Sequence, residues 1–234
     1  IQDESSRIAK PRPFPFKETV DPRQYSQLLR SLSQLDVITY KSVAQRGEAE
    51  FTEWLNETRN DFELKNLVLV GSPSSHGDIK LSLSDAYKTL VKQNSDVFLG
   101  GVTIAERHAS KRNEHERLVE KTAQGCKFFI SQAVYNAQAT IDLITSYARS
   151  CKAQGTAPKR IILTFTPCGG EKTLEFMEWL GISVPEATKY RMLDSANTLS
   201  ESVRICRENL DLILQSCAHL DVPLGLNIES LTNR

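Results

Sequence analysis

The sequence lacks the features that would mark a membrane, nucleic-acid or metal protein. No apolar run approaches the ~20 residues that a bilayer-spanning helix needs. Lys and Arg number 29, as do Asp and Glu, so the zero net charge does not favour a polyanionic partner such as nucleic acid. The 4 histidines are too dispersed for a metal-binding motif, and no HExxH, GxxxxGK(S/T) or GxSxG motif is present.

Cysteine is scarce and shows no paired spacing. The chain has 5 cysteines, an odd number, and none of them stand at CxxC spacing. We therefore expect buried, reduced thiols in a cytoplasmic protein. A lowered pKa would make Cys168, beside Gly169 and Gly170, a nucleophile, and an inert thiol is the alternative.

What the sequence does contain is an alternation of short apolar runs and helical patterns. Residues 128–130 form an apolar run typical of a strand buried on both faces, and a helical pattern follows from 137 to about 150. Polar side chains, Gln132 among them, lie where this strand ends, and we call such a polar segment at the carboxyl end of a strand its tip. The same reasoning predicts strands over 36–42, 66–70, 97–104, 160–166 and 223–229, and helices over 22–32, 48–62, 85–93, 113–124, 172–180 and 184–218, the last broken near Asp194. Asp21, with Pro22 at the first helical position, and Ser84 are the expected N-caps of the helices over 22–32 and 85–93, and residues 106–108 are the expected polar end of the strand over 97–104.

This order predicts an α/β protein, a (β/α)8 barrel of the TIM type that spans residues 1–234 as a single domain. Residues 1–7 resemble the polar tip of a strand, so we expect the body of the first strand to lie upstream of Ile1. An open, doubly wound sheet is the alternative. We favour the barrel because polar tips follow every strand, as around a common mouth, and because no GxGxxG follows any strand.

The polar tips are the expected site, since ligands of parallel α/β proteins bind at the carboxyl ends of the strands. Gln132 is therefore the first candidate for a substrate contact. Residues 125–132, Gly-Cys-Lys-Phe-Phe-Ile-Ser-Gln, resemble Gly-Ala-Asp-Phe-Phe-Ile-Thr-Gln of the methylenetetrahydrofolate reductase family, whose glutamine binds the folate. Residues 66–73 resemble the family's strand ending in Arg-Gly-Asp-Pro, and His108 corresponds to the histidine of its Tyr-Pro-x-x-His tip. The resemblance covers roughly residues 36–234.

The resemblance implies an oxidoreductase of one-carbon metabolism that reduces methylenetetrahydrofolate to methyltetrahydrofolate with FAD and NAD(P)H. This reaction needs a proton donor near the pterin, and a carboxylic acid with a raised pKa supplies one. Glu4 and Glu229 are the catalytic candidates because each follows a strand, and a solvated carboxylate at the rim is the alternative for both. Gln132 and Asn227 offer the paired donors and acceptors that a pterin needs, and Tyr135 is a third candidate substrate contact.

Cofactor contacts are expected at three other tips. Thr39 and Lys41 end one strand, and Gly71 with Ser72 offers backbone N–H groups and a hydroxyl to an anion. His108 is a candidate for holding a phosphate or a glutamate tail. Ordinary surface loops are the alternative for these positions.

The candidate flavin site departs from the family at two positions. Where the family has Arg-Gly-Asp, this chain has Val70-Gly71-Ser72. The arginine helps to hold the flavin and the aspartate stabilises cationic folate states, so we expect the isolated protein to carry little or no FAD.

Two other functions remain open. One is a folate-binding one-carbon transferase that moves no hydride, and the other is a non-catalytic barrel that binds a ligand or assembles without chemistry. A small-molecule folate is the expected partner of the reductase and of the transferase, and homo-oligomerisation is left open.

Overall fold

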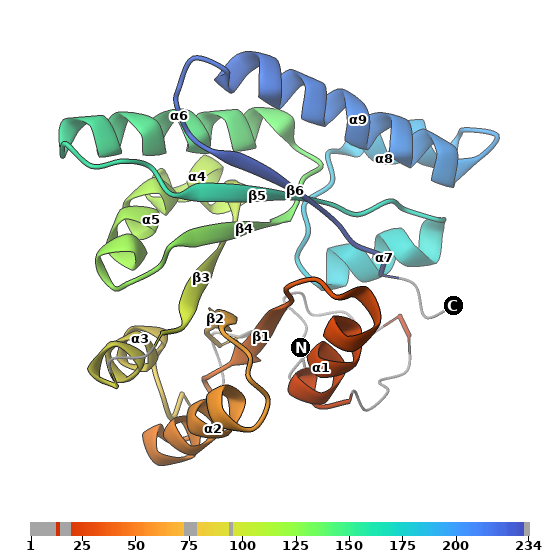
Figure 1. The fold of residues 1–234 in the computed structure, drawn as a ribbon. Coiled ribbons are helices and arrows are strands. Elements are labelled where there is room, and N and C mark those ends of the chain that lie inside the picture. Colours follow the sequence, from red (N-terminus) through yellow and green to blue (C-terminus); the bar gives the residue numbers. More distant parts are fainter. Residues whose placement is uncertain (1–12, 15–19, 73–78, 94–95, 232–234) are drawn as a thin grey trace. The chain divides into compact units, whose positions relative to one another are not determined.

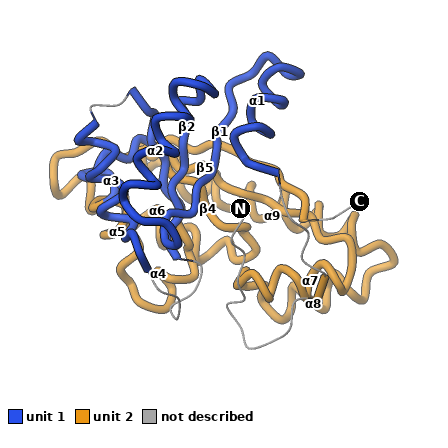
Figure 2. The backbone as a smooth tube through the Cα atoms, turned by 90° about the horizontal axis from the view of Figure 1, so that it is seen from below, with its two compact units in different colours: residues 1–5, 16–102, 121–127 blue, residues 6–15, 103–120, 128–234 orange. Residues whose placement is uncertain are grey.

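The structure is a computed structural model that describes residues 13–14, 20–72, 79–93 and 96–231. The predicted tip at residues 1–7, with Glu4, lies outside these residues. The chain divides into two compact units (Figure 2). Unit 1 consists mainly of residues 16–102 and 121–127, and unit 2 mainly of residues 103–120 and 128–234.

Unit 1 contains three parallel strands that pair in chain order (Figure 1). Their order does not reverse, which is what the barrel prediction requires of consecutive strands. The strands are β1 (Ile38–Ser42), β2 (Asn66–Val70) and β3 (Phe98–Thr103), and the helices of this part of the chain are α1 (Pro22–Ser33), α2 (Glu48–Asn60) and α3 (Leu83–Lys92).

Short local signals set the helix ends in unit 1. Asp21 caps α1 by accepting a hydrogen bond from Arg23 N at 2.8 Å, with Pro22 at the first helical position, as predicted. The prediction that Ser84 caps α3 is wrong. Ser82 is the cap, because its Oγ accepts from Asp85 N at 3.1 Å and donates to the Asp85 carboxylate. Gly125 follows α5 (Glu114–Ala123) with a φ of 108°, a conformation that favours glycine.

Unit 2 contains the second set of parallel strands, which also pair in chain order. Helices α6 and α9 lie side by side on one face of this sheet (Figure 1). The strands are β4 (Phe128–Ala133), β5 (Arg160–Phe165) and β6 (Leu224–Ile228). The helices are α4 (Ala105–Lys111), α5 (Glu114–Ala123, which ends in unit 1), α6 (Ala137–Ala153), α7 (Glu171–Trp179), α8 (Glu186–Leu193) and α9 (Thr198–Cys217).

The predicted α/β alternation is confirmed, including the helix break near Asp194, which separates α8 from α9. Helix α4 is the exception, since residues 106–108 were expected as the polar end of a strand. It has only 7 residues, and its N-cap, Ile104, makes no side-chain capping bond. The sequence therefore contains neither an apolar period nor a capping residue that would predict this helix. Closure of the sheet into a barrel stays a prediction.

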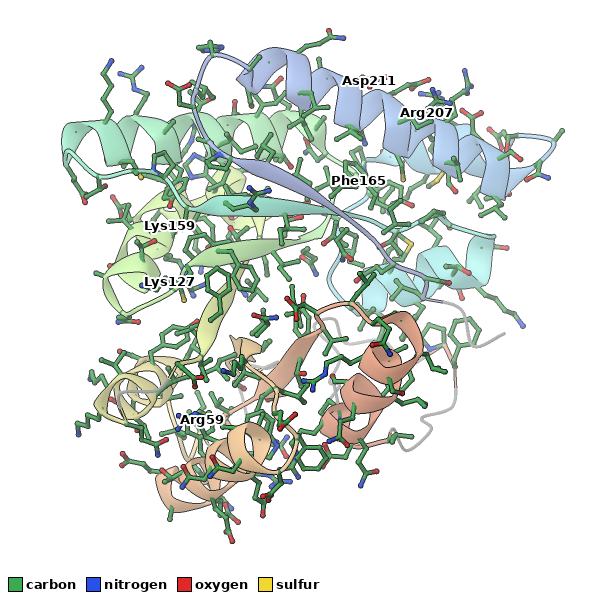
Figure 3. All side chains as sticks on the ribbon, in the orientation of Figure 1. Arg59, Lys127, Lys159, Phe165, Arg207 and Asp211 are labelled. Carbon is green, nitrogen blue, oxygen red and sulfur yellow. The ribbon has the colours of Figure 1, made fainter. Side chains whose placement is uncertain are left out.

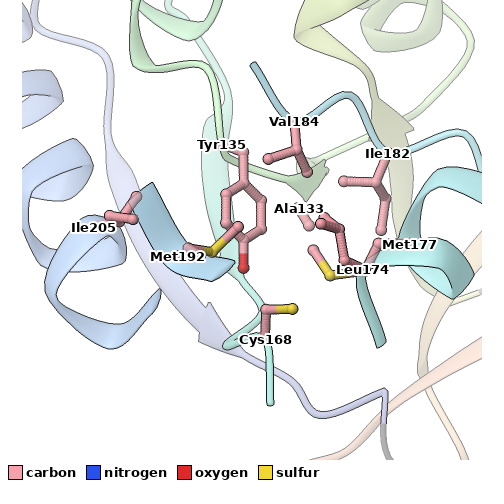
Figure 4. Packing of buried hydrophobic residues seen from close by; sticks show 9 residues of the cluster. All are labelled: Ala133, Tyr135, Cys168, Leu174, Met177, Ile182, Val184, Met192 and Ile205. Atoms are coloured by element: carbon pink, nitrogen blue, oxygen red, sulfur yellow. The ribbon is translucent and has the colours of Figure 1, made fainter. Parts of the chain in front are cut away.

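A sulfur-rich apolar cluster fills unit 2 between the end of β4 and helices α7, α8 and α9 (Figure 4). Cys168 and Met177 are fully buried in it, and Tyr135 stands among them with its hydroxyl directed toward Cys168. All 5 cysteines are free and buried, as expected. None of the helices in the described ranges combines the length and apolarity needed to cross a membrane.

Strand β5 is largely buried, and Figure 3 labels Lys159, just before its start, and Phe165 at its carboxyl end. Leu163 of β5 and Leu226 of β6 are register partners and lie on the same face of the sheet. Leu163 is fully buried, whereas Leu226 is 53% exposed. Leucine therefore contributes to the core on β5 and faces solvent on β6.

We predict that Leu163→Ala lowers the free energy of unfolding by about 2–5 kcal/mol, because it leaves a cavity in the core. Leu226→Ala is the matched control and should cost less than about 1 kcal/mol, as exposed positions do. Urea denaturation of both variants measures the difference. Equal losses would contradict the burial seen at these two positions.

Candidate functional site

Four polar side chains share one face at the carboxyl ends of β5 and β6. Thr164 is the register partner of Asn227, and Asn227 Nδ2 donates to Thr164 Oγ1 at 3.2 Å. Two residues further along, Thr166 Oγ1 donates to Glu229 Oε1 at 3.1 Å. Since side chains alternate along a strand, this row lies on the face opposite Leu163. We call Thr164, Thr166, Asn227 and Glu229 the polar row.

Glu229 stands at the outer end of the polar row. Its backbone N–H donates to Phe165 O at 3.1 Å, which extends the β5–β6 pairing by one residue. The residue as a whole is exposed, but protein around its carboxyl removes part of the water. This desolvation raises the pKa of Glu229 above its ordinary value, and hydrogen bonds from Thr166 and Asn227 act in the opposite direction. Such a carboxyl exchanges protons closer to neutral pH than a solvated one.

Strand β4 contains an irregularity at the candidate residue Gln132. Ile130 pairs with Ile162 and Ala133 with Thr164, so Ser131 and Gln132 together lie opposite Leu163, as in a β-bulge. Ser131 Oγ compensates for the interrupted ladder by accepting from Thr164 N at 2.9 Å. Bulges re-aim side chains, and they are frequent beside binding sites.

Among the described residues, only one of the two polar atoms of the Gln132 amide has a hydrogen-bond partner. Its Nε2 donates to Leu180 O at 3.5 Å, while its buried Oε1 has no hydrogen-bond partner among the described residues. A buried acceptor without a donor costs about 1–3 kcal/mol. Gln132 therefore has an unsatisfied, buried acceptor at the same end of the sheet as Asn227 and Glu229.

Tyr135 lies in the interior of unit 2, in the apolar cluster with Cys168 and Met177. It is 2% exposed, and its hydroxyl donates to Thr166 O at 2.5 Å. Asn209 of α9 donates to the Tyr135 carbonyl at 3.4 Å. Burial raises the pKa of Tyr135 well above its ordinary value, so the hydroxyl stays protonated and remains a donor.

His108 is also buried, at 2% exposure, on α4. Its Nε2 bonds with Ser146 Oγ of α6 at 3.1 Å, and its Nδ1 lies 3.4 Å from Nδ1 of His115. Burial lowers the pKa of His108, and the nearby His115 and Arg112 lower it further. The carboxylates of Asp142 and Glu114 act in the opposite direction without cancelling the effect.

The candidate cofactor residues of unit 1 divide into two groups. Thr39 and Lys41 are buried on the face of β1 that packs against helices. Thr39 Oγ1 bonds with Ser26 Oγ of α1 at 2.8 Å, and Lys41 Nζ lies 5.2 Å from the ring centroid of Trp54 of α2. The second group, Gly71 and Ser72, directly follows β2 and is half-buried. Their roles toward a cofactor stay predictions.

Two residues of the polar row, Thr164 and Thr166, were not singled out from the sequence. Thr164 and Thr166 alternate with Leu163 and Phe165, and this period of two was the signal that one face of β5 is polar.

Cys168 was considered as a nucleophile, but burial raises the pKa of its thiol, which favours the inert alternative. In the described part of the chain, no group of three His, Cys, Asp or Glu side chains is placed to hold a metal.

Comparison with solved structures finds a relative that is similar over most of this chain. No family profile matches the chain, and the comparison with curated proteins finds no match. A solved structure of an uncharacterized protein from Clostridium thermocellum, which binds two copies of 5-methyl-5,6,7,8-tetrahydrofolic acid, is 37% identical with a TM-score of 0.81 and covers 93% of this chain and 74% of that one.

Two further solved structures are much less similar. Oxaloacetate acetylhydrolase with a bound inhibitor is 12% identical over 84% of this chain and 76% of that one, with a TM-score of 0.42. A 2,3-dimethylmalate lyase is 13% identical over 85% of this chain and 75% of that one, also with a TM-score of 0.42.

We predict that His108 makes the protein less stable in mild acid. The unfolded chain binds a proton on this histidine near its ordinary pKa of 6.5, whereas the folded protein binds it only at lower pH. Stability therefore falls as the pH drops below 6.5, by at most about 1.4 kcal/mol per pH unit for one proton. Replacing His108 by Gln, whose amide still reaches toward Ser146, should make this slope shallower.

Urea unfolding at a series of pH values measures the slope. His219→Gln is the control because His219 is exposed. An unchanged slope in His108→Gln, or an equal change in both variants, would rule out His108 as the source.

Proposed function

The chain belongs to the same family as the folate-binding protein from Clostridium thermocellum, and on that premise we propose that it binds a reduced folate of the 5-methyltetrahydrofolate class. The observation that carries the proposal is this relationship, because the relative's bound ligand identifies a chemical class. It agrees with the resemblance of residues 125–132 to a folate-binding segment of the methylenetetrahydrofolate reductase family.

We place the pterin ring against the carboxyl ends of β4, β5 and β6. A reduced pterin offers several N–H donors and one carbonyl acceptor. Gln132 Oε1 and the Glu229 carboxylate supply acceptors, and the Asn227 amide supplies both a donor and an acceptor. The buried, unmatched acceptor on Gln132 gains the most from such a ligand, because the folate N–H would remove its desolvation penalty.

Two chemistries are compatible with a folate at this position. In the first, the protein reduces methylenetetrahydrofolate with NAD(P)H, and Glu229 donates the proton. The raised pKa of Glu229 supports this version, with Glu4 as a second candidate acid. In the second, the protein binds folate for one-carbon transfer or storage without hydride chemistry, and Glu229 only orients the ring. Folate binding is common to both.

The cofactor contacts proposed for the reductase version are Thr39, Lys41, Gly71, Ser72 and His108. A (β/α)8 barrel is the proposed architecture, supported by the sequential order of parallel strands in each unit. A cytoplasmic location is proposed on the basis of the free cysteines.

We predict that Gln132→Ala weakens binding of 5-methyltetrahydrofolate about ten- to a hundredfold, because a pterin N–H loses its acceptor. Gln215→Ala is the control, since Gln215 is an exposed glutamine on α9. Isothermal titration calorimetry measures both variants. Unchanged affinity in Gln132→Ala would place the folate elsewhere, and absence of binding by the unmodified protein would refute the proposed function.

The flavin prediction separates the two chemistries. Val70 and Ser72 provide neither the guanidinium fork that holds a pyrophosphate nor a carboxylate. Each lost charged contact weakens binding by about 1.5–3 kcal/mol, or one to two decades. We expect the purified protein to be colourless, and Val70→Arg with Ser72→Asp to raise flavin affinity.

Visible absorption and flavin titration test this expectation. The matched control introduces the same two side chains as Val203→Arg with Ser200→Asp on the exposed surface of α9. Stoichiometric FAD in the unmodified protein would overturn the expectation. Oxidation of NAD(P)H with methylenetetrahydrofolate would establish the reductase, and binding without oxidation would leave the second chemistry.

A further inference from the structure

A continuous series of contacts runs from the interior of unit 2 to the outer end of the polar row. The Tyr135 hydroxyl donates to the carbonyl of Thr166 at 2.5 Å. The Thr166 hydroxyl donates to the Glu229 carboxylate at 3.1 Å. Tyr135 is thus two hydrogen bonds away from Glu229 while it is itself buried at 2% exposure.

The segment that carries Thr166 needs such support because it lies beyond the end of β5, where the β-ladder no longer fixes the backbone. Helix α9 fixes the next turn of the chain. Ser202 Oγ accepts from Cys168 N at 2.9 Å and donates to Cys168 O at 3.1 Å. The same helix also holds Tyr135, through the bond of 3.4 Å from Asn209 Nδ2 to the Tyr135 carbonyl.

We infer that Tyr135 is a positioning residue for the folate site. Its hydroxyl donates to the Thr166 carbonyl and so keeps the Thr166 hydroxyl directed at the Glu229 carboxylate. This assigns Tyr135 a different role from direct substrate contact. Its consequence for ligand binding rests on the proposed function, whereas the effect on Glu229 belongs to the ligand-free protein and can be measured separately.

The titratable groups that influence Tyr135 are two thiols, those of Cys206 and Cys168, and the Cys206 thiol also hydrogen-bonds with the Tyr135 side chain. Burial raises the pKa of both thiols. They stay neutral near pH 7, so the effect of Tyr135 on Glu229 passes through the hydrogen bonds at Thr166. The hydrogen bond from Thr166 lowers the pKa of Glu229, and weakening it therefore raises that pKa.

The test compares two Tyr→Phe substitutions that each remove one buried hydroxyl. Tyr135→Phe breaks the bond to Thr166 O. Tyr147→Phe is the matched control, because Tyr147 is fully buried in the same unit and its hydroxyl accepts from Lys159 N at 2.9 Å, at the start of β5. Thr166→Val removes the donor to Glu229 itself, and Thr166→Ser retains it.

The first measurement is the titration of Glu229 in the ligand-free protein, followed by NMR of carbon-labelled glutamate and assigned with Glu229→Gln. We expect the midpoint to rise in Tyr135→Phe and Thr166→Val, and to stay unchanged in Tyr147→Phe and Thr166→Ser. If Tyr135→Phe fails to fold, Asn209→Ala loosens Tyr135 without deleting it and should give a smaller rise. A Glu229 titration that is the same in the Tyr135, Asn209 and Tyr147 variants would overturn the inference.

The second measurement is the affinity for 5-methyltetrahydrofolate as a function of pH. Tyr135→Phe should weaken binding about three- to tenfold and move its acid limb to higher pH, while Tyr147→Phe leaves both unchanged. A response of the Glu229 titration without any folate binding would refute the proposed function and support the positioning role. Folate binding that is equally strong in the Tyr135 and Tyr147 variants at every pH would refute the role of Tyr135 in the site.

Discussion

The parallel register between β5 and β6 is the constraint on which the candidate site depends. Because Thr164 pairs with Asn227, the alternation of side chains brings two hydroxyls, an amide and a carboxyl onto one face and sends Leu163 to the other. A shift of the pairing by one residue would exchange the two faces. The hydrogen bonds Asn227–Thr164 and Thr166–Glu229 follow from that register and reinforce it.

The backbone framework could be predicted because its signals are local. Apolar runs of strand length and helical periods each report on a few neighbouring residues, and they located the strands and the break near Asp194. Helix α4 escaped because a short helix without a capping side chain leaves no such signal. The cap of α3 was misplaced by two residues because Ser82 and Ser84 are chemically equal choices until the Asp85 contact decides between them.

The direction of individual side chains could not be predicted, because it depends on packing between segments far apart in the chain. Tyr135 and His108 both follow strands and both carry polar atoms, which made them candidates for a ligand-facing surface. In the structure, each directs its polar atoms to a partner inside the protein, Thr166 for Tyr135 and Ser146 for His108. Those partners are 31 and 38 residues away along the chain.

The bulge at Ser131 and Gln132 gives the site a dependence on chain length as well as on chemistry. Its extra residue places two side chains where a regular strand would have one. The orientation of Gln132 therefore depends on the number of residues in β4. Deleting a single residue at this point would restore regular alternation while leaving every functional group of the polar row intact. Relatives that differ here by one insertion or deletion would therefore share the same residues and present a different surface to a ligand.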